Sequence, residues 1–172
     1  MKLKLILLAG LLLAPLIVLH AADQSGRVDV GLPAKAGAGF DPIAEAALQA
    51  MARRATELNV KGVAVVAYAE GEAVRGWSSK MAVIGELTNP PTEKSKGANL
   101  LGIAYAKAAE MAETLQNSGQ AGRKPLTGEY GWQGGVIKKV KTGYLIAAFS
   151  GGPSEADVKI SQAGLDTLAG IF

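Results

Sequence analysis

The stretch that decides the fold covers residues 144–172 and reads YLIAAFSGGPSEADVKISQAGLDTLAGIF. Residues 144–149 form a short apolar run that ends at turn residues, a pattern typical of a buried strand. A helix is expected to begin near residue 154. Either Pro153 takes its first position, or Ser154 is the N-cap and Asp157 closes a capping box. The predicted buried stripe of this helix comprises Val158, Leu165, Leu168, Ala169 and Phe172.

A glycine-rich turn, Ser150-Gly151-Gly152, joins this strand to this helix. Unpaired backbone N–H groups and the positive end of the helix dipole meet at such a junction, and together they favour an anionic group. The same turn also occurs as a tight connection that binds nothing. We therefore take Ser150, Gly151 and Gly152 as candidate ligand-binding residues, with the simple turn as the alternative.

Residues 1–22 have the layout of a secretory signal peptide. Two lysines precede an uncharged apolar run over residues 5–19, and two alanines follow it. The run is shorter than the ~20 residues that a membrane-spanning helix needs, so a retained anchor is the less favoured alternative. The pattern predicts a periplasmic or secreted protein that has no membrane contact once the signal is removed.

Composition narrows the chemistry of the mature chain. The one histidine, His20, lies within the predicted signal, and the sequence contains no cysteine. Ser-His-Asp and Cys-His catalysis, nearly all zinc sites and the commonest haem axial ligands are thereby excluded. The full chain has 18 basic and 15 acidic residues, and loss of Lys2 and Lys4 leaves 16 against 15, a formal charge of +1. We therefore expect no nucleic-acid partner.

The first half of the remaining chain predicts a helix followed by short strands. Residues 23–39, rich in glycine and alanine, are expected to be a flexible lead-in to a domain that covers residues 40–172. Asp41 is expected to cap the first helix, with Pro42 in its first position.

A hairpin is expected next. Residues 60–69 are rich in β-branched side chains, Glu70-Gly71 forms a turn, and residues 72–78 return as the second strand. Residues 80–84 are expected to form a third short strand, and residues 85–97 a loop.

The second half predicts a long helix, a loop and a further hairpin. Residues 98–117 carry the longest helical pattern, and Gly119 stands where a C-terminal glycine belongs. Residues 118–135 form a glycine-rich loop that contains Tyr130 and Trp132, and residues 136–141 form a strand. Strands gathered in hairpins, with helices between and after them, predict an α+β fold: an antiparallel sheet of about five strands with helices packed on it.

Three sequence segments resemble the GlcG/HbpS-like haem-binding family. These are AFSGGPSEADVKISQAGL at the C-terminal end, Ala106-Lys107-Ala108 within the long helix, and Gly134-Gly135-Val136 before the last hairpin. The resemblance implies a small α+β domain that self-associates and binds haem or a related tetrapyrrole. Without histidine or cysteine, haem iron would need Tyr, Met or Lys, or would bind without a protein ligand.

The candidate ligand-binding residues outside the glycine turn are Lys107, Tyr130 and Trp132. Lys107 could pair with a carboxylate arm of the ligand, and the two aromatic rings could stack on its flat body. A solvated or packing lysine, and aromatic residues that hold the loop or a subunit contact, are the alternatives. We therefore predict an exported, self-associating, non-catalytic protein that binds haem or a similar planar anionic ligand. The alternatives are a small-metabolite enzyme that uses Lys107 or Glu129, and a purely structural scaffold.

Overall fold

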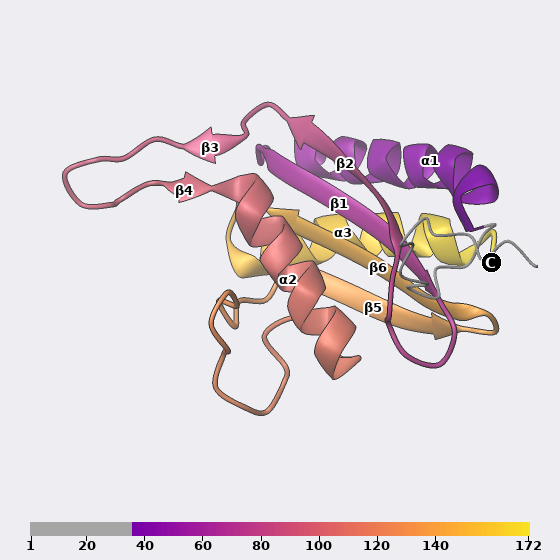
Figure 1. Ribbon diagram of the computed structural model, residues 1–172. Coiled ribbons are helices and arrows are strands. Elements are labelled where there is room, and N and C mark those ends of the chain that lie inside the picture. Colours follow the sequence, from indigo (N-terminus) through magenta and orange to yellow (C-terminus); the bar gives the residue numbers. More distant parts are fainter. Residues whose placement is uncertain (1–35) are drawn as a thin grey trace, which may run out of the picture. The chain divides into compact units, whose positions relative to one another are not determined.

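A computed structural model describes residues 36–172. Its centre is an antiparallel four-stranded sheet in the order β2-β1-β6-β5 (Figure 1). The bounds of these strands are Gly62–Glu70 for β1, Ser78–Ile84 for β2, Gly135–Val140 for β5 and Gly143–Ser150 for β6. The predicted α+β class is confirmed, with four strands in this sheet, not five.

One face of the sheet is covered by two helices, α1 (Ala36–Glu57) and α3 (Ser154–Ala169), which also pack against each other. The alternating side chains of β1 and β6 that face them include Val66 and Phe149. Phe149 and Met51 of α1 are among the largest fully buried side chains of the described residues. The cluster on this face is the largest hydrophobic core cluster of the described residues.

The opposite face is covered by α2 (Leu100–Thr114), which crosses β1 and β6 in front of the sheet in Figure 1. Two smaller clusters form there. Ala108 and Met111 of α2 pack on Ile146, while Leu100 and Ala104 pack on Val65. Because β1 and β6 have cores on both faces, almost every residue of these two strands is buried.

The expected strand at residues 144–149 and the helix after it are confirmed as β6 and α3. The caps predicted for α3 are wrong, because Pro153 itself is the extended N-cap residue and no side chain caps the helix. Leu165 and Leu168 are buried as expected. Phe172 is 41% exposed, and its ring stacks on Tyr68 with 4.6 Å between centroids.

The ends of the other two helices, α1 and α2, also differ from the sequence prediction. Helix α1 begins at Ala36, inside the expected lead-in, so Asp41 is not its cap and Pro42 lies within it. Helix α2 begins after Asn99, whose side chain accepts from the backbone N–H of Gly102, and it ends at Leu115 in a left-handed conformation. A leucine therefore takes the C-cap, four residues before the glycine expected to end the helix.

The first hairpin is longer than predicted. Residues 72–77 form no strand, and Ser78–Ile84 is the strand that returns along β1, with Tyr68 opposite Ser78 and Gly62 opposite Ile84. The expected second strand is thus part of the connecting loop, and the expected third strand is the true partner of β1. Beyond it, β3 (Thr88–Asn89) and β4 (Ala98–Asn99) form a two-stranded ribbon that extends away from the sheet (Figure 1).

The predicted signal and most of the predicted lead-in lie outside the described residues. Among residues 36–172, no helix has the length and apolar character needed to cross a membrane.

Candidate functional site

The centre of the candidate site is a buried ion pair between Lys107 of α2 and Asp157 of α3. The Lys107 Nζ lies 2.8 Å from the Asp157 Oδ2, and the two side chains are only 3% and 4% exposed. The same Nζ also donates to the backbone carbonyl of Phe149 at 2.7 Å. Asp157 in turn accepts from the backbone N–H of Gly152 at 2.9 Å through its Oδ1. The pair therefore ties α2, the end of β6 and the start of α3 together.

Burial acts on both charges of this pair. It lowers the pKa of Lys107 below the ordinary lysine value, and the neighbouring Asp157 carboxylate opposes that effect. Burial likewise raises the pKa of Asp157, against the influence of Lys107 and of the backbone N–H groups of Gly152 and Gly151. Each charge thus depends on the other, because neither has enough water to solvate it.

Two glycines make room for this arrangement. A Cβ on Gly134 would lie 2.3 Å from the Lys107 Nζ, and its φ of +133° is one that other residues rarely adopt. A Cβ on Gly151 would lie 2.0 Å from the backbone oxygen of Lys61, the residue just before β1. The glycine turn therefore exists partly to let the ends of β1 and β6 approach each other.

A cavity of about 260 Å³ lies beside the ion pair. It is formed by the base of the β3–β4 ribbon, the first turns of α2, the glycine-rich loop and the turn into α3. Its lining residues are Asn89, Ala98, Leu100, Ile103, Lys107, Trp132, Gln133, Ser150, Gly151, Gly152, Ser154 and Asp157. Of the predicted binding residues, the fold thus brings together Lys107, Trp132, Ser150, Gly151 and Gly152.

Tyr130 is the predicted site residue that does not line this cavity. Its ring packs against that of Trp132, with 4.7 Å between centroids and 31° between ring planes. Both residues are about half exposed. The two aromatic rings therefore form one exposed surface, and Trp132 connects that surface to the cavity.

In the glycine turn, where we expected an anionic ligand group to bind, a carboxylate of the protein itself is bound. The N–H of Gly152, a group predicted to bind a ligand, donates to Asp157. The turn and the start of α3 therefore already hold one negative charge, as expected near the positive end of a helix dipole. Any ligand group entering the cavity meets this neutralised pair and not an open cradle of N–H groups.

Glu129, the other candidate for acid–base chemistry, lies apart from this cavity in a bidentate pair with Arg123. The two carboxylate oxygens accept from the guanidinium at 2.7 and 3.0 Å, and one also accepts from the backbone N–H of Leu126. The hydrogen bonds from Arg123 lower the pKa of Glu129 to about 2. Such a group carries no proton at neutral pH and is a weak base, so its role is to hold the loop.

Sequence reasoning missed two residues that the structure brings into prominence, Asp157 and Glu110. The sequence pattern indicates a helix cap at Asp157, whereas in the structure Asp157 is the partner of Lys107. Glu110 of α2 is 2% exposed. The sequence of α2 contains a pattern that could have identified Glu110 as buried. Lys107 and Glu110 recur at helical spacing with the buried residues Ile103, Ala104 and Met111. Charged residues within an apolar stripe indicate buried partners.

Comparison with known proteins supports the fold. No family model matches the sequence, and no curated protein matches it. Among solved structures, the fold is similar to that of the Klebsiella pneumoniae protein ORFY, which belongs to DUF336, a GlcG-like family. The match covers 76% of this chain and 90% of ORFY, with a TM-score of 0.52 and 18% sequence identity. The resemblance noted in the sequence is thus confirmed at the level of the fold.

Proposed function

We propose that this chain is a non-catalytic binding protein for a planar anionic ligand, haem or a related tetrapyrrole. The observation that carries the proposal is the convergence of Lys107, Trp132 and the turn at residues 150–152 on one cavity. These residues lie far apart in the sequence. A cation and a flat ring are the groups that a flat molecule with carboxylate arms would use, while the turn shapes the cavity wall, since its Gly152 N–H is already bound to Asp157.

The size of the cavity suggests how such a ligand would sit. Its volume of about 260 Å³ is below the ~300–1,000 Å³ that is common for sites enclosing a whole small molecule. One carboxylate arm would therefore enter the cavity, and the flat body would lie outside on Trp132 and Tyr130. A lysine ammonium has three N–H donors, and the contacts to Asp157 and Phe149 use two of them. The third has no recorded partner among residues 36–172 and would be the donor to the arm.

The residues around this cavity fit the organic part of haem better than its iron. The lining contains no Tyr or Met among its described residues, and Lys107 is engaged with Asp157. We therefore expect affinity to come from ring stacking and the carboxylate arm. In that case the iron-free porphyrin binds almost as well as haem.

The protein's two tryptophans, Trp77 and Trp132, give a direct test. The variant Trp77→Phe leaves Trp132 as the sole indole, and its fluorescence should be quenched saturably by both haem and the iron-free porphyrin. The matched variant Trp132→Phe keeps Trp77, which packs against α2 and β6, and should bind more weakly. Binding of haem without binding of the iron-free ring would contradict the proposed mode, and binding of neither would overturn the function.

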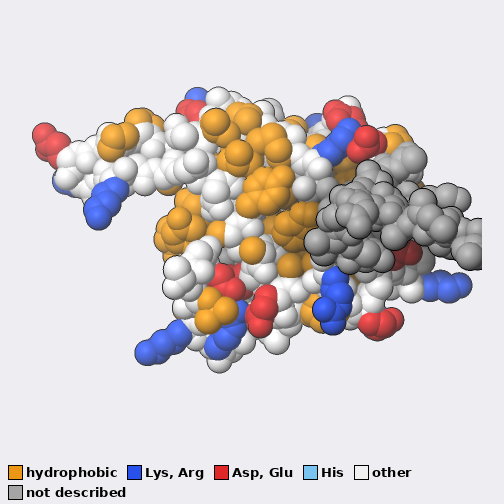
Figure 2. Space-filling view, viewed as in Figure 1, with side chains coloured by type: hydrophobic (Ala, Val, Ile, Leu, Met, Phe, Trp, Pro, Cys, Tyr) orange, Lys and Arg blue, Asp and Glu red, His pale blue; other side chains and the backbone are white. Residues whose placement is uncertain are grey.

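The same proposal includes export and self-association. Large hydrophobic side chains remain exposed on the described domain, among them Leu126, Trp132 and Val83, each about half exposed. Figure 2 shows hydrophobic side chains gathered over the middle of the face that carries α2. Apolar surface of this kind commonly marks an interface between subunits. Export rests on the signal-like residues 1–22.

A small-metabolite enzyme is the second candidate, and one observation favours it. Burial shifts the pKa values of Lys107 and Asp157 toward each other, and both residues line the cavity, which is an arrangement suited to proton transfer. Without porphyrin binding, this pair would be the place to look for chemistry. The other alternative, a purely structural scaffold, would self-associate but would bind neither haem nor the iron-free porphyrin.

A further inference from the structure

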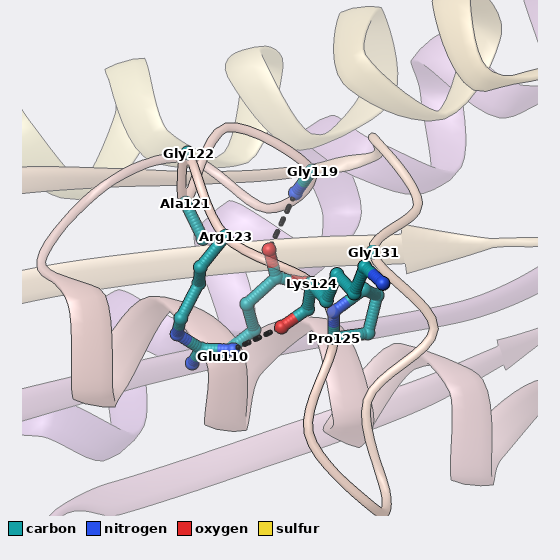
Figure 3. A pocket seen from close by; sticks show the side chains of 8 residues that line it. All are labelled: Glu110, Gly119, Ala121, Gly122, Arg123, Lys124, Pro125 and Gly131. Carbon is teal, nitrogen blue, oxygen red and sulfur yellow. Dashed lines mark hydrogen bonds between the residues drawn. The ribbon is translucent and has the colours of Figure 1, made fainter.

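A cavity larger than the candidate site lies between α2 and the glycine-rich loop, with a volume of about 560 Å³ (Figure 3). Two of the three charged side chains that line it have no group left for a ligand. The Arg123 guanidinium holds Glu129 at 2.7 Å and Glu113 at 2.6 Å. Of the Glu110 carboxylate, Oε1 accepts a backbone N–H, and Oε2 has almost no accessible surface. A ligand in this cavity would therefore find few polar partners.

The smaller cavity, beside the ion pair, contains a buried hydroxyl that a ligand can reach. Ser150 is the last residue of β6 and is only 4% exposed. It pairs with Val63, so its side chain lies on the face of the sheet where Val63 packs against Leu100 of α2. Its Oγ has no recorded hydrogen bond among residues 36–172, yet it is not one of their unpaired atoms that are sealed from solvent. The hydroxyl is therefore accessible from the cavity that Ser150 lines.

The charges around this hydroxyl favour an anionic group. Lys107 and Asp157 cancel formally, and both carboxylate oxygens of Asp157 are engaged. Its Oδ2 accepts from Lys107 and its Oδ1 from the Gly152 N–H. The beginning of α3 adds roughly half a positive charge from the helix dipole. The local sum is therefore positive.

The rest of the cavity suits a short hydrocarbon chain. Leu100 and Ile103 in the first turns of α2, together with Ala98 at the base of the ribbon, form an apolar wall. A water molecule occupies about 30 Å³ in the liquid, so a cavity of about 260 Å³ holds roughly eight groups of that size. A carboxylate with an alkyl chain of about three carbons fits within this volume.

We propose that this cavity binds a short-chain aliphatic monocarboxylate, and that the Ser150 hydroxyl donates a hydrogen bond to its carboxylate group. Lys107 supplies the countercharge, and the alkyl chain lies against Leu100 and Ile103. Ser150 is then the residue that determines specificity for the carboxylate. The inference rests on the proposed function in that it concerns the same cavity, and it adds a ligand class that binds there without a ring.

The first experiment uses the whole folded chain labelled with nitrogen-15. Sodium butyrate is titrated, and the amide signals of Ser150 and Gly151 are followed, because both residues line the cavity. We expect shifts that saturate. Butyramide has a similar shape but no charge, and sodium chloride at equal ionic strength has no alkyl chain, so neither should give a saturable shift at the same concentrations. Equal binding of butyramide, or shifts that rise linearly with butyrate, overturn the inference.

The second experiment tests the hydroxyl itself. Ser150→Ala removes the Oγ from the cavity, whereas the control Ser79→Ala removes a hydroxyl that lies beside Tyr105 on β2 and does not line the cavity. We expect Ser150→Ala to weaken butyrate binding by about fivefold or more, because a hydrogen bond to a charged group is lost, and Ser79→Ala to change it by less than about twofold. Thermal melting shows that each variant is folded. Equal effects of the two substitutions refute the role of Ser150.

The inference and the proposed function can fail separately. Binding of porphyrin but not of butyrate overturns the short-chain ligand and leaves the proposed function in place. Binding of butyrate but not of porphyrin supports the inference and overturns the planar ligand. Binding of neither overturns both.

Discussion

The buried pair of Lys107 and Asp157 leads to the sharpest stability prediction. Replacing Lys107 by Met keeps a long side chain but leaves the Asp157 carboxylate buried, with backbone N–H groups as its remaining partners. Replacing Asp157 by Asn keeps an oxygen for the Gly152 N–H but leaves the ammonium facing a neutral amide. Breaking a buried pair from one side generally costs ~3–5 kcal/mol, and exposures of 3% and 4% place this pair in that class.

The expected magnitudes follow from that cost. Each single variant should lose ~3–5 kcal/mol of unfolding free energy, which for a domain of this size lowers Tm by roughly 10–20 °C. The double variant contains neither charge, so its loss should be smaller than the sum of the single losses by ~1–3 kcal/mol. Urea unfolding followed by circular dichroism gives all the free energies needed for the cycle.

Two results would refute this reasoning. A loss below about 1 kcal/mol for Lys107→Met would mean that water reaches the Asp157 carboxyl or that it takes up a proton, and in either case no buried charge would be left unpaired. Strict additivity of the two substitutions would mean that the charges do not interact. As a control, Lys61→Met removes a lysine from an exposed pair with Glu86, and its effect should stay within about 1 kcal/mol.

Three further predictions concern the loop, the site and the assembly. Arg123 lowers the pKa of Glu129 to about 2 from an ordinary value of 4.5, so the contribution of Glu129 to folding stability is full above pH 4.5 and is lost as the pH falls through about 2. Acid unfolding of Glu129→Gln, followed by fluorescence, should therefore depend less on pH between these values than acid unfolding of the parent chain. Gly134→Ala should destabilise more than Gly71→Ala, since both have positive φ but only a Cβ at Gly134 meets other atoms, and equal unfolding free energies would contradict the crowding around Lys107. Light scattering on residues 23–172 should give a mass well above that of one chain, and a monomer at micromolar concentration would rule out the proposed self-association.

The elements that could be predicted from the sequence are those with a strong local signal. The run at residues 144–149 is apolar on both faces because cores lie on both sides of β6, and that continuous pattern was readable without knowing the partners. The class of fold followed from the order of such segments. Helix starts were less predictable, since Pro42 favours a first turn but is tolerated within α1.

What could not be predicted depends on contacts between distant residues. The sequence pattern of residues 72–78 is typical of a returning strand, but β1 pairs instead with Ser78–Ile84. The register of such a pair depends on which side chains are buried on each face of the sheet, and this is not visible in the sequence of one strand. Lys107 and Asp157 were each visible in the sequence. Their contact was not, because it depends on how α2 and α3 meet at the end of β6.

The position of β1 has a consequence for how the chain acquires its fold. One edge of β1 pairs with β2, which follows directly, but the other pairs with β6, so that Val63 lies opposite Ser150. Helix α1 likewise finds its partner in α3, the last helix of the sequence. A nascent chain therefore keeps an open strand edge and an uncovered helix until the ribosome has made residues 143–169, and contacts so distant in sequence also close slowly. Such late closure suits the proposed export, because a polypeptide without its final segment stays loose enough to be threaded through a translocation channel.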